Sequence, residues 1–136
     1  MTDMIAPPGG SIIAVVDDDQ RVLESLGSLL DSADHSVHLF DSAAAMLDSG
    51  CLAGITCLIS DIDMPVMDGF ELLGIVKAQR PDLAVILITG QSSKVNQNRS
   101  VDQGGYRLLK KPFSAHDLLS MIGAASQGAA PLAPPP

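Results

Sequence analysis

Side chains that can do chemistry follow four short apolar runs in this sequence. An Asp-Asp-Asp run ends at Asp19, and an Asp-Ile-Asp run begins at Asp61. A Thr-Gly pair begins at Thr89, and two lysines precede Pro112. Because the carboxyl ends of parallel strands meet at one edge of a sheet, these groups converge if the runs are strands of one sheet. The sequence therefore predicts a cluster of carboxylates with a hydroxyl and a cation beside it.

The chemistry of such a cluster is that of a metal-assisted nucleophile. Three carboxylates in one place repel one another unless a positive charge lies between them. Mg²⁺ prefers oxygen ligands and keeps several waters, so the cluster predicts a magnesium site, which Mn²⁺ would also fit. A carboxylate beside such an ion can attack phosphorus, while the ion and a lysine offset negative charge on the transferred group. Asp61 is thus a candidate for an aspartyl phosphate.

The elements that must position these residues are indicated by hydrophobic periodicity. Short apolar runs alternate with longer segments of helical period, which predicts an α/β fold: a doubly wound parallel sheet with helices on both faces. We expect five strands and five helices. The expected strands are Ile12–Val16, Val37–Phe40, Cys57–Ser60, Val85–Thr89 and a short one around Leu108–Leu109.

The five expected helices differ in how strongly the sequence signals them. A leucine repeat predicts the first, up to about Ala33, and a Ser or Asp cap predicts the second, over residues 42–48. Capping-box sequences that begin at Asp68 and Ser114 predict the third and fifth helices. The polar segment Ser92–Gln103 is expected to form the fourth, with few apolar side chains to anchor it.

Composition restricts the class of protein. The chain has 136 residues, which suits one domain; we expect it over 11–126, with flexible segments at 1–10 and at the Ala/Pro-rich 127–136. A net charge of −8 disfavours direct binding to nucleic acid or anionic membranes. No apolar run reaches the ~18 residues of a membrane span, and the start lacks a signal-peptide pattern, so we expect a cytoplasmic protein. Cys51 and Cys57 are expected to be reduced thiols.

Four segments carry a resemblance to a known family. In order and in spacing, VVDDD, SDIDMPVMDG, ITG and KKPF resemble the signatures of response-regulator receiver domains, and they are most similar to the single-domain chemotaxis and nitrogen-fixation regulator types. The resemblance covers about Ile12 to Ile122. It implies a flavodoxin-like sheet with strand order 2-1-3-4-5 and a phosphorylation switch of two-component signalling.

The resemblance also implies roles for the acidic residues. Asp61 would be the phospho-acceptor, and Mg²⁺ would bind Asp18, Asp61 and the backbone carbonyl of Asp63, with Asp17 in support. Asp63 and Gln91 would line the path of attacking water and so affect how long the phosphoryl group survives.

Further roles fall on residues near the ends of the last two strands. Lys111 would contact the phosphoryl oxygens, and a cis Lys111–Pro112 peptide would aim it there. Thr89 would be the switch hydroxyl, and Gly90 would leave space beside the phosphoryl group. Leu108 departs from the family, which usually has an aromatic residue at this position, so signalling by an aromatic rotamer is in doubt.

The partner implied is a sensor histidine kinase or a histidine phosphotransfer protein that donates the phosphoryl group. The output would be contact with an unknown downstream protein or competition for phosphoryl groups as a sink, and the chain would be a monomer or weak dimer. It would not be an enzyme in the ordinary sense, although it would catalyse its own phosphorylation and slow autodephosphorylation.

Two other functions fit parts of the sequence. The Asp-x-Asp beginning at Asp61 also resembles the nucleophile motif of haloacid-dehalogenase-type phosphatases, but that motif follows the first strand of its fold, whereas this one follows the third expected strand. The other function is an unphosphorylated, constitutive interaction module with the same fold. The complete set of acidic, hydroxyl and basic side chains argues against the interaction module.

Overall fold

Five parallel strands form one sheet in this protein. The structure is a computed structural model that describes residues 11–90 and 106–126. Its strand order, β2-β1-β3-β4-β5, confirms the predicted doubly wound topology. The strands are β1 (Ile12–Val16), β2 (Ser36–Phe40), β3 (Cys57–Asp61), β4 (Ala84–Thr89) and β5 (Tyr106–Lys110).

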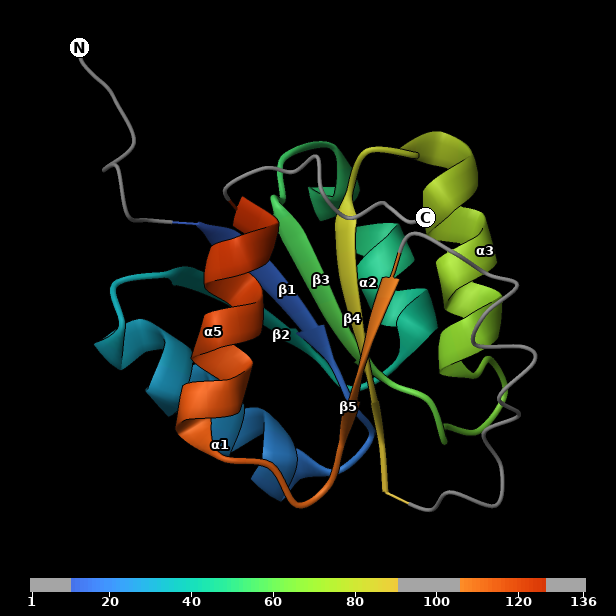
Figure 1. Cartoon of the computed structure of the whole chain (residues 1–136). Coiled ribbons are helices and arrows are strands. Elements are labelled where there is room, and N and C mark those ends of the chain that lie inside the picture. The colour runs from blue at the N-terminus through green and yellow to red at the C-terminus, as the bar shows by residue number, and fades with distance from the viewer. Residues whose placement is uncertain (1–10, 91–105, 127–136) are drawn as a thin grey trace, which may run out of the picture.

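Helices cover both faces of the sheet (Figure 1). The described helices are α1 (Gln20–Ser32), α2 (Ala43–Ser49), the short 3-10 helix η1 (Cys51–Ala53), α3 (Gly69–Gln79) and α5 (Ala115–Ser126). Apolar residues of α1 and α5 pack on one face, and those of α2 and α3 pack on the other. The expected helix at Ser92–Gln103 lies outside the described residues. None of the described helices is long and apolar enough to cross a membrane.

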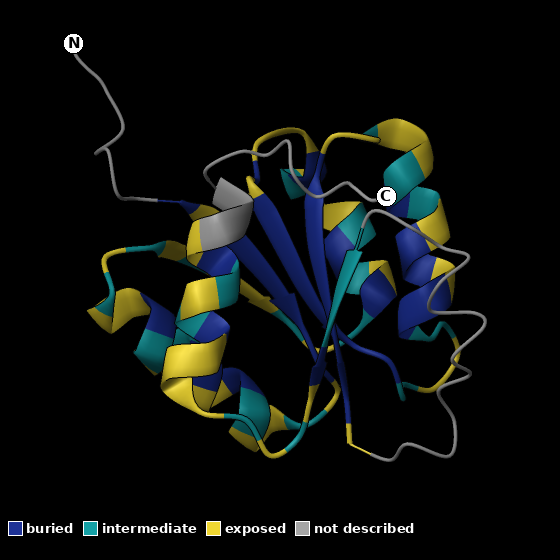
Figure 2. Cartoon of the chain, viewed as in Figure 1, coloured by how far each residue is buried: buried dark blue, intermediate teal, exposed yellow. Residues whose placement is uncertain are grey.

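Burial explains why the three central strands are continuous apolar runs. Every residue of β3 and β4 is buried, as are four of the five in β1, since helices lie on both sides of them (Figure 2). Successive side chains of β1 point to opposite faces, with Ile13 in the α1/α5 layer and Ala14 in the α2/α3 layer. The edge strands β2 and β5 are only partly buried.

Side-chain caps begin the helices where the sequence predicts them. Asp68 accepts a hydrogen bond from the Glu71 amide at 2.9 Å, and the Glu71 carboxylate accepts one from the Asp68 amide at 2.9 Å, which completes a capping box. Ser42 caps α2, and Ser114 accepts from the Asp117 amide at 3.0 Å. Because these bonds are local, sequence alone locates the helix starts well.

The two cysteines lie in different environments, and this leads to a chemical prediction. Cys57 is 2% exposed in β3, and burial raises its pKa to about 12, whereas Cys51 is half-buried in η1. We expect a disulfide reagent such as DTNB to label Cys51 of the folded protein quickly and Cys57 only after unfolding, because the thiolate is the reactive form. Absorbance at pH 8 with and without urea measures both. Rapid release of two thiols from the folded protein would contradict this expectation.

Candidate functional site

The predicted reactive groups converge at one edge of the sheet, the lower end in Figure 1. Asp17 and Asp18 directly follow β1, and Asp61 is the last residue of β3. Thr89 is the last residue of β4, and Lys111 directly follows β5. All of them lie at carboxyl ends of neighbouring parallel strands, as the doubly wound fold requires.

The acidic cluster contains three carboxylates. Asp17, Asp18 and Asp61 each offer an oxygen within 4.8 Å of the others. Asp17 and Asp61 are 2% and 5% exposed, whereas Asp18 is open to solvent. The Oδ1 atom of Asp17 accepts a hydrogen bond from the Asp19 amide at 2.9 Å, but its buried Oδ2 atom has no hydrogen-bond partner. A buried carboxylate oxygen without a partner is costly unless it binds a cation or water.

Burial perturbs the protonation of this cluster. Desolvation, followed by the charge of Asp17, raises the pKa of Asp61 to about 6, although Lys111 opposes the shift. Desolvation likewise raises the pKa of Asp17. Without a bound cation, each buried carboxylate therefore resists ionisation more than it would in water. Strongly perturbed carboxyls at a strand edge are typical of functional sites.

Lys111 supplies the positive charge beside Asp61. Its Nζ atom lies 3.7 Å from the Asp61 Oδ1 atom, and its backbone amide donates to the Thr89 carbonyl at 2.8 Å. The Lys111–Pro112 peptide is cis, as the resemblance implied. A Cβ on Gly90 would approach the Lys111 side chain to 3.4 Å, so the glycine leaves room beside the lysine stem.

The acidic cluster fits a divalent cation of the Mg²⁺ type. Oxygen ligands of one Mg²⁺ at about 2.1 Å lie at most about 4.2 Å apart, so the three carboxylates need only small movements. All the donors are hard oxygens, and the unpartnered Asp17 oxygen lies among them. The fit rests on the chemistry and spacing of these side chains.

Ser60 is a site residue that our sequence analysis missed. It is fully buried in β3, and its hydroxyl donates to the Asp61 carbonyl at 3.0 Å. A Cβ on Gly69 would lie 2.7 Å from that same carbonyl oxygen, so glycine is required there by close approach to the backbone. The peptide after Asp61 is thereby held between Ser60 and the start of α3. A serine within the apolar run Cys57–Ser60 was the available signal.

The loop from β3 to α3 has an unusual backbone. Val66 has a φ of +69°, and the Met67 amide donates to the Pro65 carbonyl at 2.7 Å, so Val66 is the central residue of a γ-turn. Positive φ is sterically unfavourable for a β-branched residue. Met64 and Met67 pack against the α2/α3 layer of the core, where flexible methionine side chains fill irregular gaps.

This strain predicts that Val66→Gly stabilises the protein. Glycine adopts positive φ without a Cβ clash, so we expect the free energy of unfolding to rise by about 1 kcal/mol, after allowance for the greater freedom of glycine in the unfolded chain. Urea unfolding followed by circular dichroism measures the change. Asp34, whose φ is +70°, is the matched comparison, and Asp34→Gly should gain less because aspartate tolerates this region better. Lower stability of Val66→Gly would show that Val66 makes favourable contacts.

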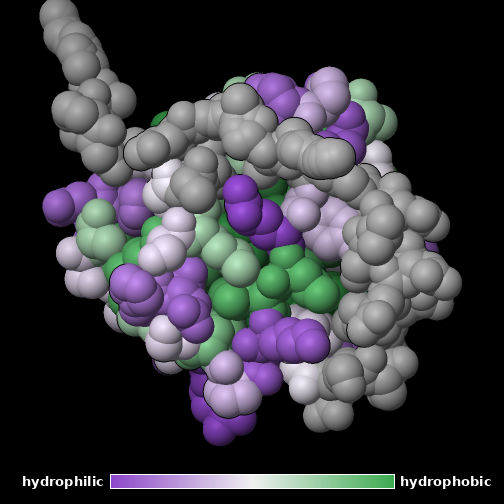
Figure 3. Space-filling model, in the orientation of Figure 1, coloured by the Kyte–Doolittle hydropathy of each residue, from purple (hydrophilic) through white to green (hydrophobic). Residues whose placement is uncertain are grey.

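Leu108 occupies the usual aromatic position and is half-buried in β5. Hydrophobic atoms gather around this strand in the middle of the face shown in Figure 3. Tyr106 packs edge-on against Phe70 of α3, with ring centroids 6.0 Å apart, and its hydroxyl is buried. Tyr106 is therefore held in the α2/α3 layer. Gln91, predicted to line water access, lies outside the described residues.

Comparison with known proteins decides the family. The family model described as the response regulator receiver domain matches residues 13–123. The chain belongs to the response regulator receiver family. A receiver domain from Clostridium thermocellum has a similar crystal structure, with a TM-score of 0.78 and 28% identity, over 86% of this chain and 94% of that one. The comparisons give no support to the phosphatase alternative.

Curated relatives of this receiver domain are longer proteins. The transcriptional regulatory protein FixJ of Bradyrhizobium diazoefficiens is 40% identical over 89% of this chain and 59% of its own length. The crystal structure of full-length FixJ from B. japonicum has a TM-score of 0.77 and 39% identity, over 89% of this chain and 60% of that one. The response regulator protein FleR of Pseudomonas aeruginosa is 33% identical over 88% of this chain and a quarter of its own. The chain thus spans about half, or less, of the curated relatives it matches.

Proposed function

We propose that this receiver domain accepts a phosphoryl group on Asp61 from the phosphohistidine of a sensor histidine kinase or histidine phosphotransfer protein. The observation that carries the proposal is the position of the Asp61 carboxylate at the end of β3, beside Asp17 and Asp18 and 3.7 Å from the Lys111 ammonium. An aspartate in this setting has both a cation site and a positive side chain to offset phosphoryl charge.

In the proposed reaction, an oxygen of Asp61 attacks phosphorus opposite to the imidazole nitrogen of the donor. The O–P bond forms as the N–P bond breaks, and the electron pair returns to the imidazole. Lys111 donates a hydrogen bond to a phosphoryl oxygen, and the Thr89 hydroxyl, at the end of the adjacent strand, donates another. Gly90 leaves room for the group beside Lys111. Both contacts are stronger to the transferred dianion than to Asp61 alone, which would bias the domain toward a second conformation.

Mg²⁺, or Mn²⁺ in its place, would be held by Asp18, Asp61 and the backbone carbonyl of Asp63, with Asp17 in support. When bound, the cation would neutralise charge on the carboxylates and on the phosphoryl oxygens. Ser60 and Gly69 would keep the Asp61 backbone fixed while the side chain reacts. Asp63 and Gln91 would set the access of water and hence the rate of slow autodephosphorylation.

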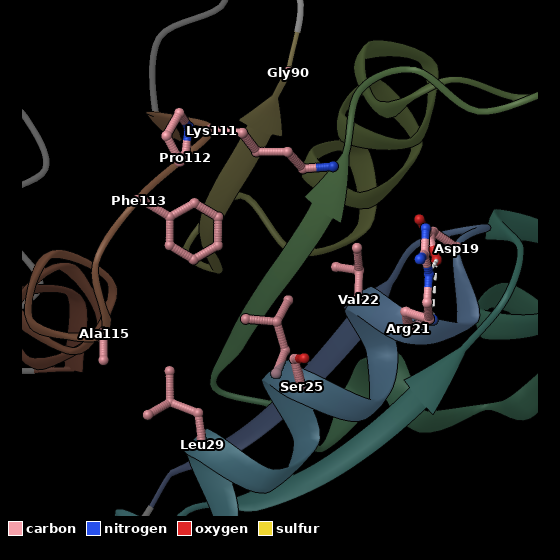
Figure 4. Close-up of a pocket in the computed structure, with 11 residues that line it drawn as sticks. Asp19, Arg21, Val22, Ser25, Leu29, Gly90, Lys111, Pro112, Phe113 and Ala115 are labelled. Atoms are coloured by element: carbon pink, nitrogen blue, oxygen red, sulfur yellow. Dashed lines mark hydrogen bonds and ion pairs between the residues drawn. The ribbon is translucent and has the colours of Figure 1, made fainter.

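A groove beside the site supports docking of a protein donor. Its volume is about 800 Å³, and it lies between α1 and the loop from β5 to α5. Figure 4 shows Val22, Ser25 and Leu29 of α1 facing Pro112 and Phe113 across it. Lys111 lines the groove and also pairs with Asp61, so a protein seated there is next to the acceptor.

The proposal extends to the setting and the output of the switch. Because histidine kinases obtain their phosphoryl group from ATP, phosphoryl transfer to this domain would take place in the cytoplasm. The domain would act as a monomer or weak dimer and signal by contact with a downstream protein rather than by binding nucleic acid itself, in keeping with the net charge of −8. Leu108 would transmit the change by apolar packing in β5 in place of an aromatic rotamer.

Intact-mass spectrometry after incubation with acetyl phosphate tests the proposed function. We expect a gain of roughly 80 Da, one phosphoryl group, that requires Mg²⁺ and is absent from Asp61→Asn. Asp48→Asn, which alters an exposed carboxylate on α2, should label like the natural chain. No gain in the natural chain with Mg²⁺ would contradict the proposal, and labelling of Asp61→Asn would show that another residue is the acceptor.

A further inference from the structure

Val66 combines two features that each oppose stability. Its side chain is fully exposed to solvent, at 101% relative accessibility, although it is apolar. Its backbone has the positive φ of a γ-turn, a conformation that β-branched residues rarely adopt. Val66 belongs to neither of the two apolar clusters of the described core, so packing within the domain does not offset the strain. Strain that persists without intramolecular gain indicates a functional position.

The loop presents Val66 at the edge of the sheet that carries the phospho-acceptor. The loop begins immediately after Asp61, and the Gly69 amide donates to the Ile62 carbonyl at 3.0 Å, which joins its two ends. The Ile62 amide in turn donates to Ile88 of β4 at 2.9 Å. Met67, next to Val66, packs on the core. Val66 is therefore the tip of a short, anchored loop and not the middle of a loose one.

A protein donor must approach the edge of the sheet that carries this loop. The Asp61 side chain is only 7% exposed, so a phosphohistidine can reach it only when the donor surface contacts the loops around Asp61. Asp63 and Lys111 place charged groups near the Asp61 carboxylate. Among the described residues, the other exposed large apolar side chains are Ile12 and Leu39, which are only 39% and 41% exposed and lie on the strands β1 and β2. Of these three described side chains, Val66 is the one that lies on a loop at the acceptor edge.

We propose that Val66 inserts into an apolar depression beside the phosphohistidine of the donor protein and so determines which donors transfer efficiently. The inference rests on the proposed function. Burial of the exposed Val66 side chain on docking adds a favourable hydrophobic free energy to the binding of a protein donor. A small donor such as acetyl phosphate has no surface to cover this side chain. Val66 thus acts on donor affinity and leaves the chemistry at Asp61 unchanged.

Phosphotransfer profiling tests this role. The probes are the sensor histidine kinases and histidine phosphotransfer proteins encoded in the same genome, each phosphorylated with radioactive ATP, directly or through its kinase. The donor that labels the natural chain fastest is then used with Val66→Ala, which removes two methyl groups, and Val66→Ile, which keeps an apolar side chain. Ile12→Ala, at the opposite end of β1 from the site, is the matched control. Acetyl phosphate labelling of all four proteins runs in parallel.

We expect Val66→Ala to lower kcat/KM for the protein donor about 10-fold, through KM, while Val66→Ile and Ile12→Ala stay within about twofold of the natural chain. Acetyl phosphate should label all four at equal rates. Unchanged transfer to Val66→Ala, or labelling of the natural chain by acetyl phosphate but by no protein donor, would overturn the inference. Equal losses with both donors would also overturn it, because Val66 would then act on the site. If neither donor labels the natural chain, the proposed function itself fails.

Discussion

Lys111→Ala is expected to slow phosphorylation by acetyl phosphate about 100- to 1000-fold at saturating Mg²⁺. Removal of one preorganised donor to a developing oxyanion has an effect of this size in enzymes. The Lys111 ammonium, 3.7 Å from Asp61, is the nearest described cation to the acceptor, so solvent would have to replace it. The rate constant is measured by intact mass as a function of time, and the loss should appear in kcat more than in KM.

The neighbouring lysine provides a matched control for this prediction. Lys110 is the last residue of β5, is exposed, and forms no ion pair among those found in the described residues. Lys110→Ala removes the same charge from the chain one position away, and we expect phosphorylation close to that of the natural protein. Equal loss in the two variants would mean that net charge near the site matters, rather than the placement of the Lys111 ammonium.

Asp61→Asn is expected to stabilise the metal-free protein above pH 6 by about 2–3 kcal/mol. Burial and Asp17 raise the pKa of Asp61 to about 6 in the folded state, above the 3.8 of an unperturbed carboxyl. The folded state therefore binds the proton more tightly than the unfolded state. The contribution of Asp61 to the free energy of unfolding is therefore most favourable below pH 3.8, and it is lost as the pH rises through about 6. Asparagine carries no charge, so Asp61→Asn does not lose stability in this way as the pH rises.

Urea unfolding in EDTA at several pH values measures the stability difference. It should be small near pH 4 and reach its full size at pH 7. Mg²⁺ should cancel most of this difference, because a cation at about 100 times its Kd adds about 2.7 kcal/mol to the natural chain and much less to a variant without the Asp61 carboxylate. Asp48→Asn, exposed on α2, should match the natural chain in both media. A less stable Asp61→Asn in EDTA would show that the carboxylate makes a net favourable contribution.

Local signals explain why much of the fold was predictable. The range Ile12–Val16 was predicted to the residue, and the capping box at Asp68 and Glu71 forms as expected. Both depend on neighbours in sequence: an unbroken apolar run for a central strand and two polar side chains three positions apart for a helix start. Strand limits that depend on pairing were less accurate. The strand β3 extends to Asp61 and β4 begins at Ala84, because register with the adjacent strand continues there.

The residue types of the candidate site were predictable for a similar reason. Asp17, Asp61, Thr89 and Lys111 each stand at the end of an apolar run, and parallel topology brings such ends together. The accessory features were not predictable in this way. The Ser60 hydroxyl was overlooked because one serine in a strand gives no signal of its partner. The close approach of Gly69 to the Asp61 carbonyl likewise depends on the folded backbone and has no local sequence signal.

The sequence by itself determined the order of elements, the strand-end position of the acceptor and the family signatures. Tertiary structure alone decided that Asp17 and Asp61 are buried while Asp18 is open to solvent, and that the pKa of Asp61 is therefore raised. It also decided that Val66 takes a positive φ and is fully exposed. The physical reason is the same in each case: desolvation and loop closure depend on segments far apart in the chain, and no local pattern of residues encodes which groups those segments will cover.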